Sequence, residues 1–163
     1  MITVEENWLN QLKMKLNQEI KAIEKKGVKV TTKQEPGRIQ VVIDLKSLTK
    51  RMREEAKEEL MKRFRLSTFQ VSFRTVKGVE LAVSQVMGEM TEEDKKKLEL
   101  LQQQYPGMFQ WTYKQGKLRV ALVLNKFYEK GLEEIIQKIN QNLAEGIALM
   151  RASGVDTLDY KIE

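Results

Sequence analysis

The chain has 163 residues, of which 41% are hydrophobic and 32% charged, and it carries a formal net charge of +6. Cysteine and histidine are both absent, which excludes disulfides, thiol nucleophiles, imidazole catalysis and Cys/His zinc sites. The sequence has no run of about eighteen apolar residues and no basic segment before an apolar one at its start. We therefore expect neither a membrane span nor a signal peptide, and a cysteine-free chain suits a reducing cytoplasm.

Two helical patterns flank a predicted hairpin at the start of the chain. Thr3 and Glu6 form a capping box that opens the first helix, and Gly27 ends it. The hairpin follows, with a type II turn at residues 35–38. We expect Ser47 to cap the second helix. The apolar residues of the hairpin and of the second helix are Val28, Val30, Ile39, Val41, Ile43, Leu45, Leu48, Met52, Ala56, Leu60 and Phe64.

A second hairpin and a short helix come next. The hairpin turns at Lys77 and Gly78. Thr91 with Asp94 repeats the capping-box pattern, and Pro106 stops the helix that this box opens. The apolar residues that alternate along the two strands of the hairpin are Phe69, Val71 and Phe73, then Val79, Leu81 and Val83.

The last third of the chain begins with a strand of alternating aromatic residues, and this strand turns at Gln115 and Gly116. Its return strand, residues 118–124, is apolar at nearly every position, so we expect it to be buried on both faces. The longest helical pattern runs from Leu132 to Met150, and a terminal strand at residues 158–162 ends the chain.

These elements predict an α+β fold in the order α-β-β-α-β-β, then α-β-β-α-β. About seven mostly antiparallel strands are expected in an open sheet, with the helices packed on one face. A chain of this length is sufficient for one core, so we expect residues 1–163 to form a single compact domain.

The two ends of this pattern resemble each other weakly. Residues 31–34 and 37–41 match residues 112–115 and 116–120 in type, and from Gly37 onward the apolar positions keep register at an offset of 79. The match indicates either a duplication, with pseudo-repeated halves at 1–90 and 91–163, or the coincidence that any α+β chain with glycine turns can show.

The positive charge is unevenly distributed. Residues 1–90 contain 18 Lys/Arg and 12 Asp/Glu, whereas residues 91–163 contain 11 of each, so the excess lies in the first half. A cluster of cations of this kind favours a phosphate backbone. The candidate nucleic-acid-binding residues, on the second helix and the second hairpin, are Lys50, Arg53, Lys57, Arg63, Arg65, Arg74 and Lys77.

An ordinary solvated helix face also explains the same cluster, and for the helix taken alone we favour it. Glu58 with Lys62 and Glu59 with Arg63 are i,i+4 pairs, each stabilising a helix by about 0.2–0.5 kcal/mol. The aromatic strand has two interpretations as well. Phe109, Trp111 and Tyr113 are either core residues, which we favour, or, with Lys114, Lys117 and Arg119 nearby, a stacking platform for single-stranded nucleic acid.

No residue pattern points to catalysis, a metal or a cofactor. Adjacent acids such as Glu54-Glu55 point about 100° apart on a helix and so do not converge on one substrate. Asp44, at a strand end, is expected to be a cap or turn residue. Neither GxxxxGK[ST] nor GxGxxG occurs.

We therefore expect a small, non-enzymatic, cytoplasmic protein that binds nucleic acid through its basic first half. The alternative is a homo-oligomeric or adaptor protein that contacts another polypeptide through a sheet edge or through a groove between the repeats. Binding to phosphates weakens steeply with salt, whereas pairing at a sheet edge barely responds, so salt dependence separates the two hypotheses.

Overall fold

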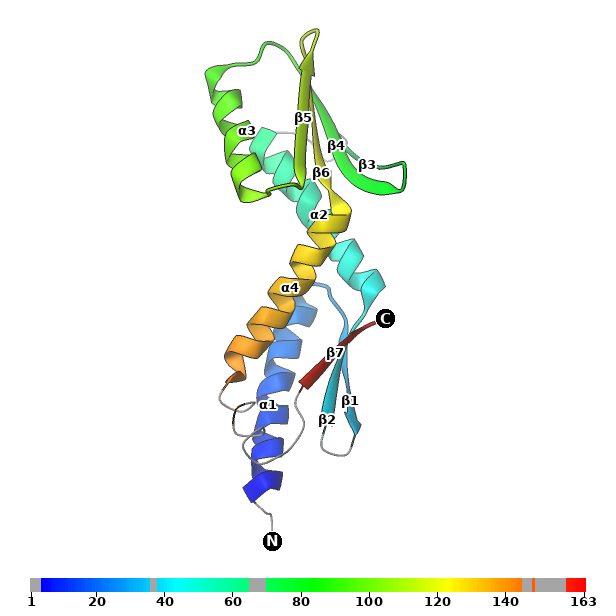
Figure 1. The fold of residues 1–163 in the computed structure, drawn as a ribbon, viewed down its shortest axis with the longest axis vertical. Coiled ribbons are helices and arrows are strands. Elements are labelled where there is room, and N and C mark those ends of the chain that lie inside the picture. Colours follow the sequence, from blue (N-terminus) through cyan, green and yellow to red (C-terminus); the bar gives the residue numbers. More distant parts are fainter. Residues whose placement is uncertain (1–3, 36–37, 65–69, 145–147, 149–157) are drawn as a thin grey trace. The chain divides into compact units, whose positions relative to one another are not determined.

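The structure is a computed structural model, and it describes residues 4–35, 38–64, 70–144, 148 and 158–163. These residues form four helices and seven strands, which confirms the predicted α+β class and element order (Figure 1). The strands lie in two mostly antiparallel sheets instead of the one open sheet expected. The predicted cap at Thr3 and the turn at residues 35–38 fall wholly or partly outside the described residues.

The chain divides into two compact units. Unit 1 comprises Met1–Arg51 with Gly131–Glu163, and unit 2 comprises Met52–Lys130. Helices α2 (Leu45–Phe64) and α4 (Leu124–Asn142) each contribute residues to both. The single domain and the internal duplication stay predictions.

Unit 1 contains a three-stranded sheet in the order β1-β2-β7. Strand β1 (Val30–Glu35) pairs antiparallel with β2 (Arg38–Ile43), and β7 (Leu158–Ile162) pairs parallel with β2. Helix α1 (Val4–Lys25) supplies a stripe of buried residues at helical spacing. The core of this unit includes Leu12, Leu16, Ile20, Ile23, Val30, Ile39, Val41, Ile43 and Leu158.

Helix α2 begins after Asp44, not at the predicted cap Ser47. The Asp44 carboxylate accepts a hydrogen bond of 2.9 Å from the backbone N–H of Ser47, and the Ser47 hydroxyl donates back to the Asp44 carbonyl at 3.0 Å. The predicted N-cap lies three residues after the observed one. Ser47 was chosen because it also takes part in the hydrogen bonds of the cap. The backbone N–H of Ser47 lowers the pKa of Asp44, since this bond favours the ionised carboxylate.

Unit 2 contains a four-stranded antiparallel sheet in the order β3-β4-β6-β5. Its strands are β3 (Val71–Val76), β4 (Val79–Met87), β5 (Phe109–Lys114) and β6 (Lys117–Val123). Helices α2 and α3 (Glu92–Gln104) lie along one side of this sheet (Figure 1). Buried residues of the helices and the sheet that form the core include Ala56, Leu60, Ala82, Leu98, Leu101, Val120 and Leu122.

Both hairpins of unit 2 turn at the predicted residues. Lys77 and Gly78 have φ values of 51° and 79°, and Gln115 and Gly116 have values of 53° and 72°. Two successive positive φ angles are typical of the type I′ turn, whose twist matches that of the flanking strands. The short turns thereby set the register of each hairpin.

Strand β6 is only partly buried, which corrects the expectation of burial on both faces. Leu118, Val120 and Leu122 are buried, but Arg119 is exposed and Ala121 half-buried. Helix α4 follows directly at Leu124, eight residues before the predicted helical pattern begins. The second face of β6 is therefore accessible at Arg119 and Ala121, whereas Val123 at its end is buried as expected.

The predicted capping box of α3 is confirmed and supports a stability prediction. The Thr91 hydroxyl accepts from the backbone N–H of Asp94, and the Asp94 carboxylate accepts from the backbone N–H of Thr91, both at 3.1 Å. We expect Thr91→Ala to lower the free energy of unfolding by about 1 kcal/mol in urea denaturation. Thr91→Ser keeps the hydroxyl and should be close to wild type; equal stability of the alanine variant would contradict the cap's contribution.

Candidate functional site

Strand pairing gives the sheet of unit 2 a covered face and an open face. Register places Ala82 opposite Leu122 and Ser84 opposite Val120, and these side chains are buried on the side that the helices cover. Side chains alternate along a strand, so the neighbouring residues point the other way. The open face is the accessible side of the sheet, where Ser72, Arg74, Leu81, Val83, Gln85, Gln110, Thr112, Arg119 and Ala121 lie.

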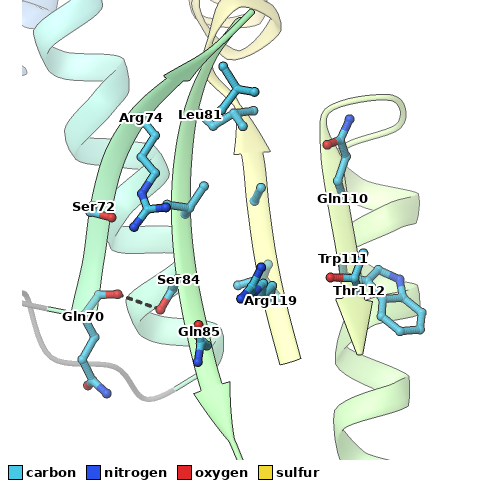
Figure 2. A pocket seen from close by; sticks show the side chains of 14 residues that line it. Gln70, Ser72, Arg74, Leu81, Ser84, Gln85, Gln110, Trp111, Thr112 and Arg119 are labelled. Carbon is cyan, nitrogen blue, oxygen red and sulfur yellow. Dashed lines mark hydrogen bonds between the residues drawn. The ribbon is translucent and has the colours of Figure 1, made fainter. Parts of the chain in front are cut away.

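The open face is hollowed into a pocket of about 540 Å³ (Figure 2). Half-buried Leu81, Val83 and Ala121 contribute apolar surface to it, while hydroxyls and amides come from β3, β4 and β5 and from Gln70 beside β3. Ser84 is buried, and its hydroxyl is satisfied by a 2.8 Å hydrogen bond to the carbonyl of Gln70. The lining residues that carry an exposed hydroxyl or amide are Gln70, Ser72, Gln85, Gln110 and Thr112.

The only charged side chains among the 14 lining residues are those of Arg74 and Arg119. Both are exposed, and neither guanidinium forms an ion pair with a carboxylate of a described residue. Their positive charge is therefore not neutralised locally, and the open face favours anions.

Two lysines extend this positive face at one end of the sheet. Lys114 and Lys117 lie directly opposite each other in the β5–β6 hairpin, and both are exposed. Like charges in this arrangement destabilise a strand pair. An anion bound beside them would relieve the repulsion.

Arg53 and Arg63, two of the predicted nucleic-acid-binding residues, form ion pairs with carboxylates within unit 2. Arg63 donates from Nε to Glu59 at 2.8 Å, and its Nη2 donates to Gln104 at 2.9 Å. Arg53 donates from Nη2 to Glu80 at 3.1 Å. Both guanidiniums therefore offer less charge to an external phosphate than the sequence suggests.

The other predicted residues are dispersed. Lys50 is exposed on α2, and Lys57 is half-buried on the same helix. Lys77 is exposed at the tip of the β3–β4 hairpin, and Arg65 lies outside the described residues. Of the six that the structure describes, Arg74 alone lines the pocket.

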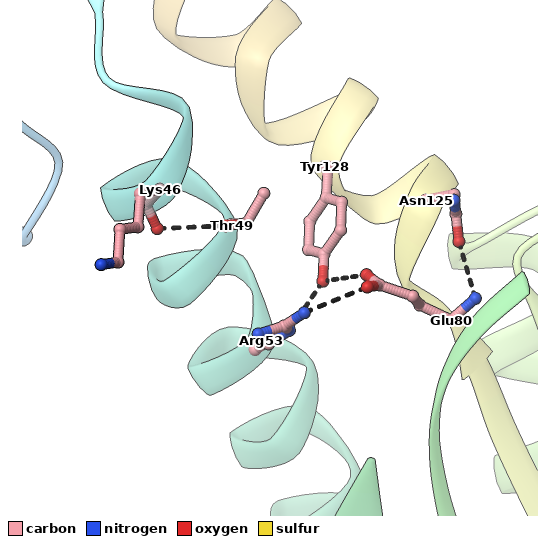
Figure 3. Close-up of polar contacts among 6 residues, drawn as sticks. All are labelled: Lys46, Thr49, Arg53, Glu80, Asn125 and Tyr128. Carbon is pink, nitrogen blue, oxygen red and sulfur yellow. Dashed lines mark hydrogen bonds and ion pairs between the residues drawn. The ribbon is translucent and has the colours of Figure 1, made fainter. Parts of the chain in front are cut away.

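Arg53 belongs to a polar network that joins α2, β4 and α4 within unit 2 (Figure 3). Its Nε donates to the hydroxyl of Tyr128 at 2.9 Å, and that hydroxyl donates to Glu80 at 2.8 Å. The backbone N–H of Glu80 donates to Asn125 at 2.9 Å. Each of these side chains is hydrogen-bonded to another member of the network. The network therefore holds the three elements together within unit 2 and is not a free acid–base pair.

Three tyrosines give the protein a predicted sensitivity to alkaline pH. Burial raises the pKa of Tyr105, Tyr128 and Tyr160 to about 12, and at Tyr128 the hydrogen bond to Glu80 adds to it. The unfolded pKa is about 10. Because the folded pKa is the higher, the stability from the neutral phenols is complete below pH 10 and is lost as pH rises towards 12.

Tyrosinate absorbance and thermal unfolding measured across this range test the expectation. The three tyrosines should ionise later than free tyrosine, and the unfolding temperature should fall over the same interval. Tyr128→Phe should reduce the number of late-titrating groups by one. Normal titration of all the tyrosines would contradict burial of these hydroxyls.

Comparisons with known protein families, curated proteins and solved structures found no match for this chain. Within the described ranges, no group of three or more acidic side chains is arranged to hold a metal ion. No described helix combines the length and the apolar character needed to cross a membrane.

Sequence reasoning recognised part of this face and missed the rest. Arg119 and the two lysines were noted beside the aromatic strand, but Gln85 and Gln110 were not singled out. The sequence pattern that could have indicated this face is the alternation of Leu81, Val83 and Gln85. These residues lie on one side of the strand, and the last of them carries a polar amide. A face that ends in an amide is a poor candidate for a core.

Proposed function

We propose that this protein binds nucleic acid through the open face of unit 2. The observation that carries the proposal is the pocket, whose lining includes Arg74 and Arg119 but no acidic residue. Guanidinium groups donate bidentate hydrogen bonds to phosphate. The opposed Lys114 and Lys117 extend the same positive surface.

The spacing of the two arginines favours a chain of phosphates over a single small anion. Arg74 is on the outer strand β3, and Arg119 is two strands away on β6 and four residues further along the ladder. With strands about 4.8 Å apart and a rise of about 3.4 Å per residue, their backbones are on the order of 15 Å apart. A repeating polyanion can occupy both sites at once.

Anisotropy of a labelled oligonucleotide, titrated with the full chain across a salt series, tests this proposal. We expect binding that weakens linearly with the logarithm of salt concentration, because phosphate contacts release counterions. A variant with Lys15→Glu and Lys21→Glu, two exposed positions on α1, controls for net charge and should bind as wild type. Absence of binding at low salt would overturn the proposal.

Self-association along β3 is a second proposal. This outer strand exposes Phe73 at 42% and Val76 at 50%, and an edge strand offers unpaired backbone groups to another chain. Sedimentation of the purified chain tests it. We expect a dimer whose stability changes little with salt; a monomer at all concentrations would contradict self-association.

A further inference from the structure

Resting on the proposed function, we infer that the open face takes single-stranded nucleic acid, with bases over the sheet and one base stacked on Trp111. The surface is a four-stranded sheet, whereas the major groove of a duplex admits a helix or a two-stranded ribbon. The outer strands of this sheet are about 14 Å apart before side chains are added. A duplex therefore cannot place its base edges against the pocket.

The pocket lining suits unpaired bases better than a phosphate backbone alone. Val83 and Ala121, opposite each other on β4 and β6, provide a half-buried apolar floor. Gln85 and Gln110 lie on the same face, and an amide both donates and accepts hydrogen bonds. Base edges present this mixture of donors and acceptors, and they are free only in single strands.

Trp111 supplies the aromatic surface at the rim of the pocket. Register directs this side chain to the covered side with Val120, but β5 is the outer strand and 36% of the residue stays exposed. Figure 2 shows the indole at the β5 edge, beside Thr112. A nucleic-acid strand that crosses the sheet from Arg74 passes over the β5 edge. There the indole can stack on a base.

Nearby aromatic residues do not offer the same surface. Phe109 is buried and Tyr113 is half-buried, with its hydroxyl donating to the Gly88 carbonyl at 3.1 Å. Trp111 is thus the most exposed of the three aromatic residues of β5. The single-strand inference consequently depends on one testable ring.

Matched single-stranded DNA, single-stranded RNA and duplex DNA of equal length, titrated at one salt concentration, test the inference. We expect at least tenfold tighter binding of one or both single strands than of the duplex. An abasic strand, which keeps the phosphates and lacks the bases, should bind more weakly than its normal counterpart. The DNA and RNA titrations show whether the sugar is also distinguished.

Variants at Trp111 separate stacking from charge. Trp111→Ala should weaken single-strand binding about tenfold and leave its salt dependence unchanged, while Trp111→Phe keeps an aromatic ring and should recover most of the affinity. Binding should quench tryptophan emission in wild type, and Trp111→Phe should remove that quenching. Circular dichroism of both variants verifies folding.

The outcomes distinguish the inference from the proposed function. Equal or tighter duplex binding, or salt-sensitive binding that Trp111→Ala leaves unchanged, would overturn the single-strand inference and preserve nucleic-acid binding. No binding to any of the oligonucleotides would overturn both.

Discussion

Changing Arg74 and Arg119 together to glutamate is expected to lower oligonucleotide affinity by about 100-fold at low salt. A hydrogen bond to a charged group contributes about 1.5–3 kcal/mol, and 1.4 kcal/mol corresponds to a tenfold change in affinity. Removing two phosphate contacts should also reduce the slope of log affinity against log salt by about two. Anisotropy titrations of wild type and variant over one salt series measure both effects.

The matched control for this prediction changes Lys50 and Lys57 on α2 to glutamate. It alters the net charge by the same amount and removes two residues of the originally predicted basic helix. We expect affinity close to wild type, because neither lysine lines the pocket. A large loss with this pair, and none with the arginine pair, would contradict the open-face proposal and identify α2 as the binding surface.

Features of this fold that depend on neighbouring residues were predictable from the sequence. The capping box at Thr91 and Asp94 needs only a four-residue pattern, and the hairpin turn at Gln115 needs only a glycine beside it. The element order followed from these signals and from the spacing of apolar residues.

The covered face of β4 was not predictable in the same way. Alternation separates Leu81 and Val83 from Ala82 and Ser84, but it does not say which set a helix covers. Leu81 and Val83 are the larger apolar pair, yet Ala82 and Ser84 face the core. Small side chains let a helix pack closely, and the Ser84 hydroxyl is satisfied by Gln70, so a tertiary contact reversed the local preference.

The candidate site was obscured for a related reason. Every arginine counts equally in a sequence, yet Arg53 is paired with Glu80, which lies 27 residues away, while Arg74 has no such ion pair among the described residues. Pairing between distant segments leaves no local pattern. Charge density along α2 therefore does not show which of its cations are already paired with a carboxylate.

Truncation of Leu122 to alanine is expected to be among the most destabilising single changes in unit 2. Leu122 is fully buried, opposite Ala82 on β4 and Phe109 on β5. Loss of a buried leucine costs about 2–5 kcal/mol, because apolar contacts disappear and a cavity remains. Domains are stable by about 5–15 kcal/mol, so urea denaturation should show a strongly lowered midpoint.

Leu81→Ala is the matched control, because it removes the same atoms from the opposite face of the sheet. Leu81 is only half-buried and lines the pocket, so its truncation should cost about 1 kcal/mol or less. A large difference between the two variants supports an open face that is accessible to a ligand. Equal losses would mean that Leu81 is as well packed as Leu122, which would contradict an open face at this position.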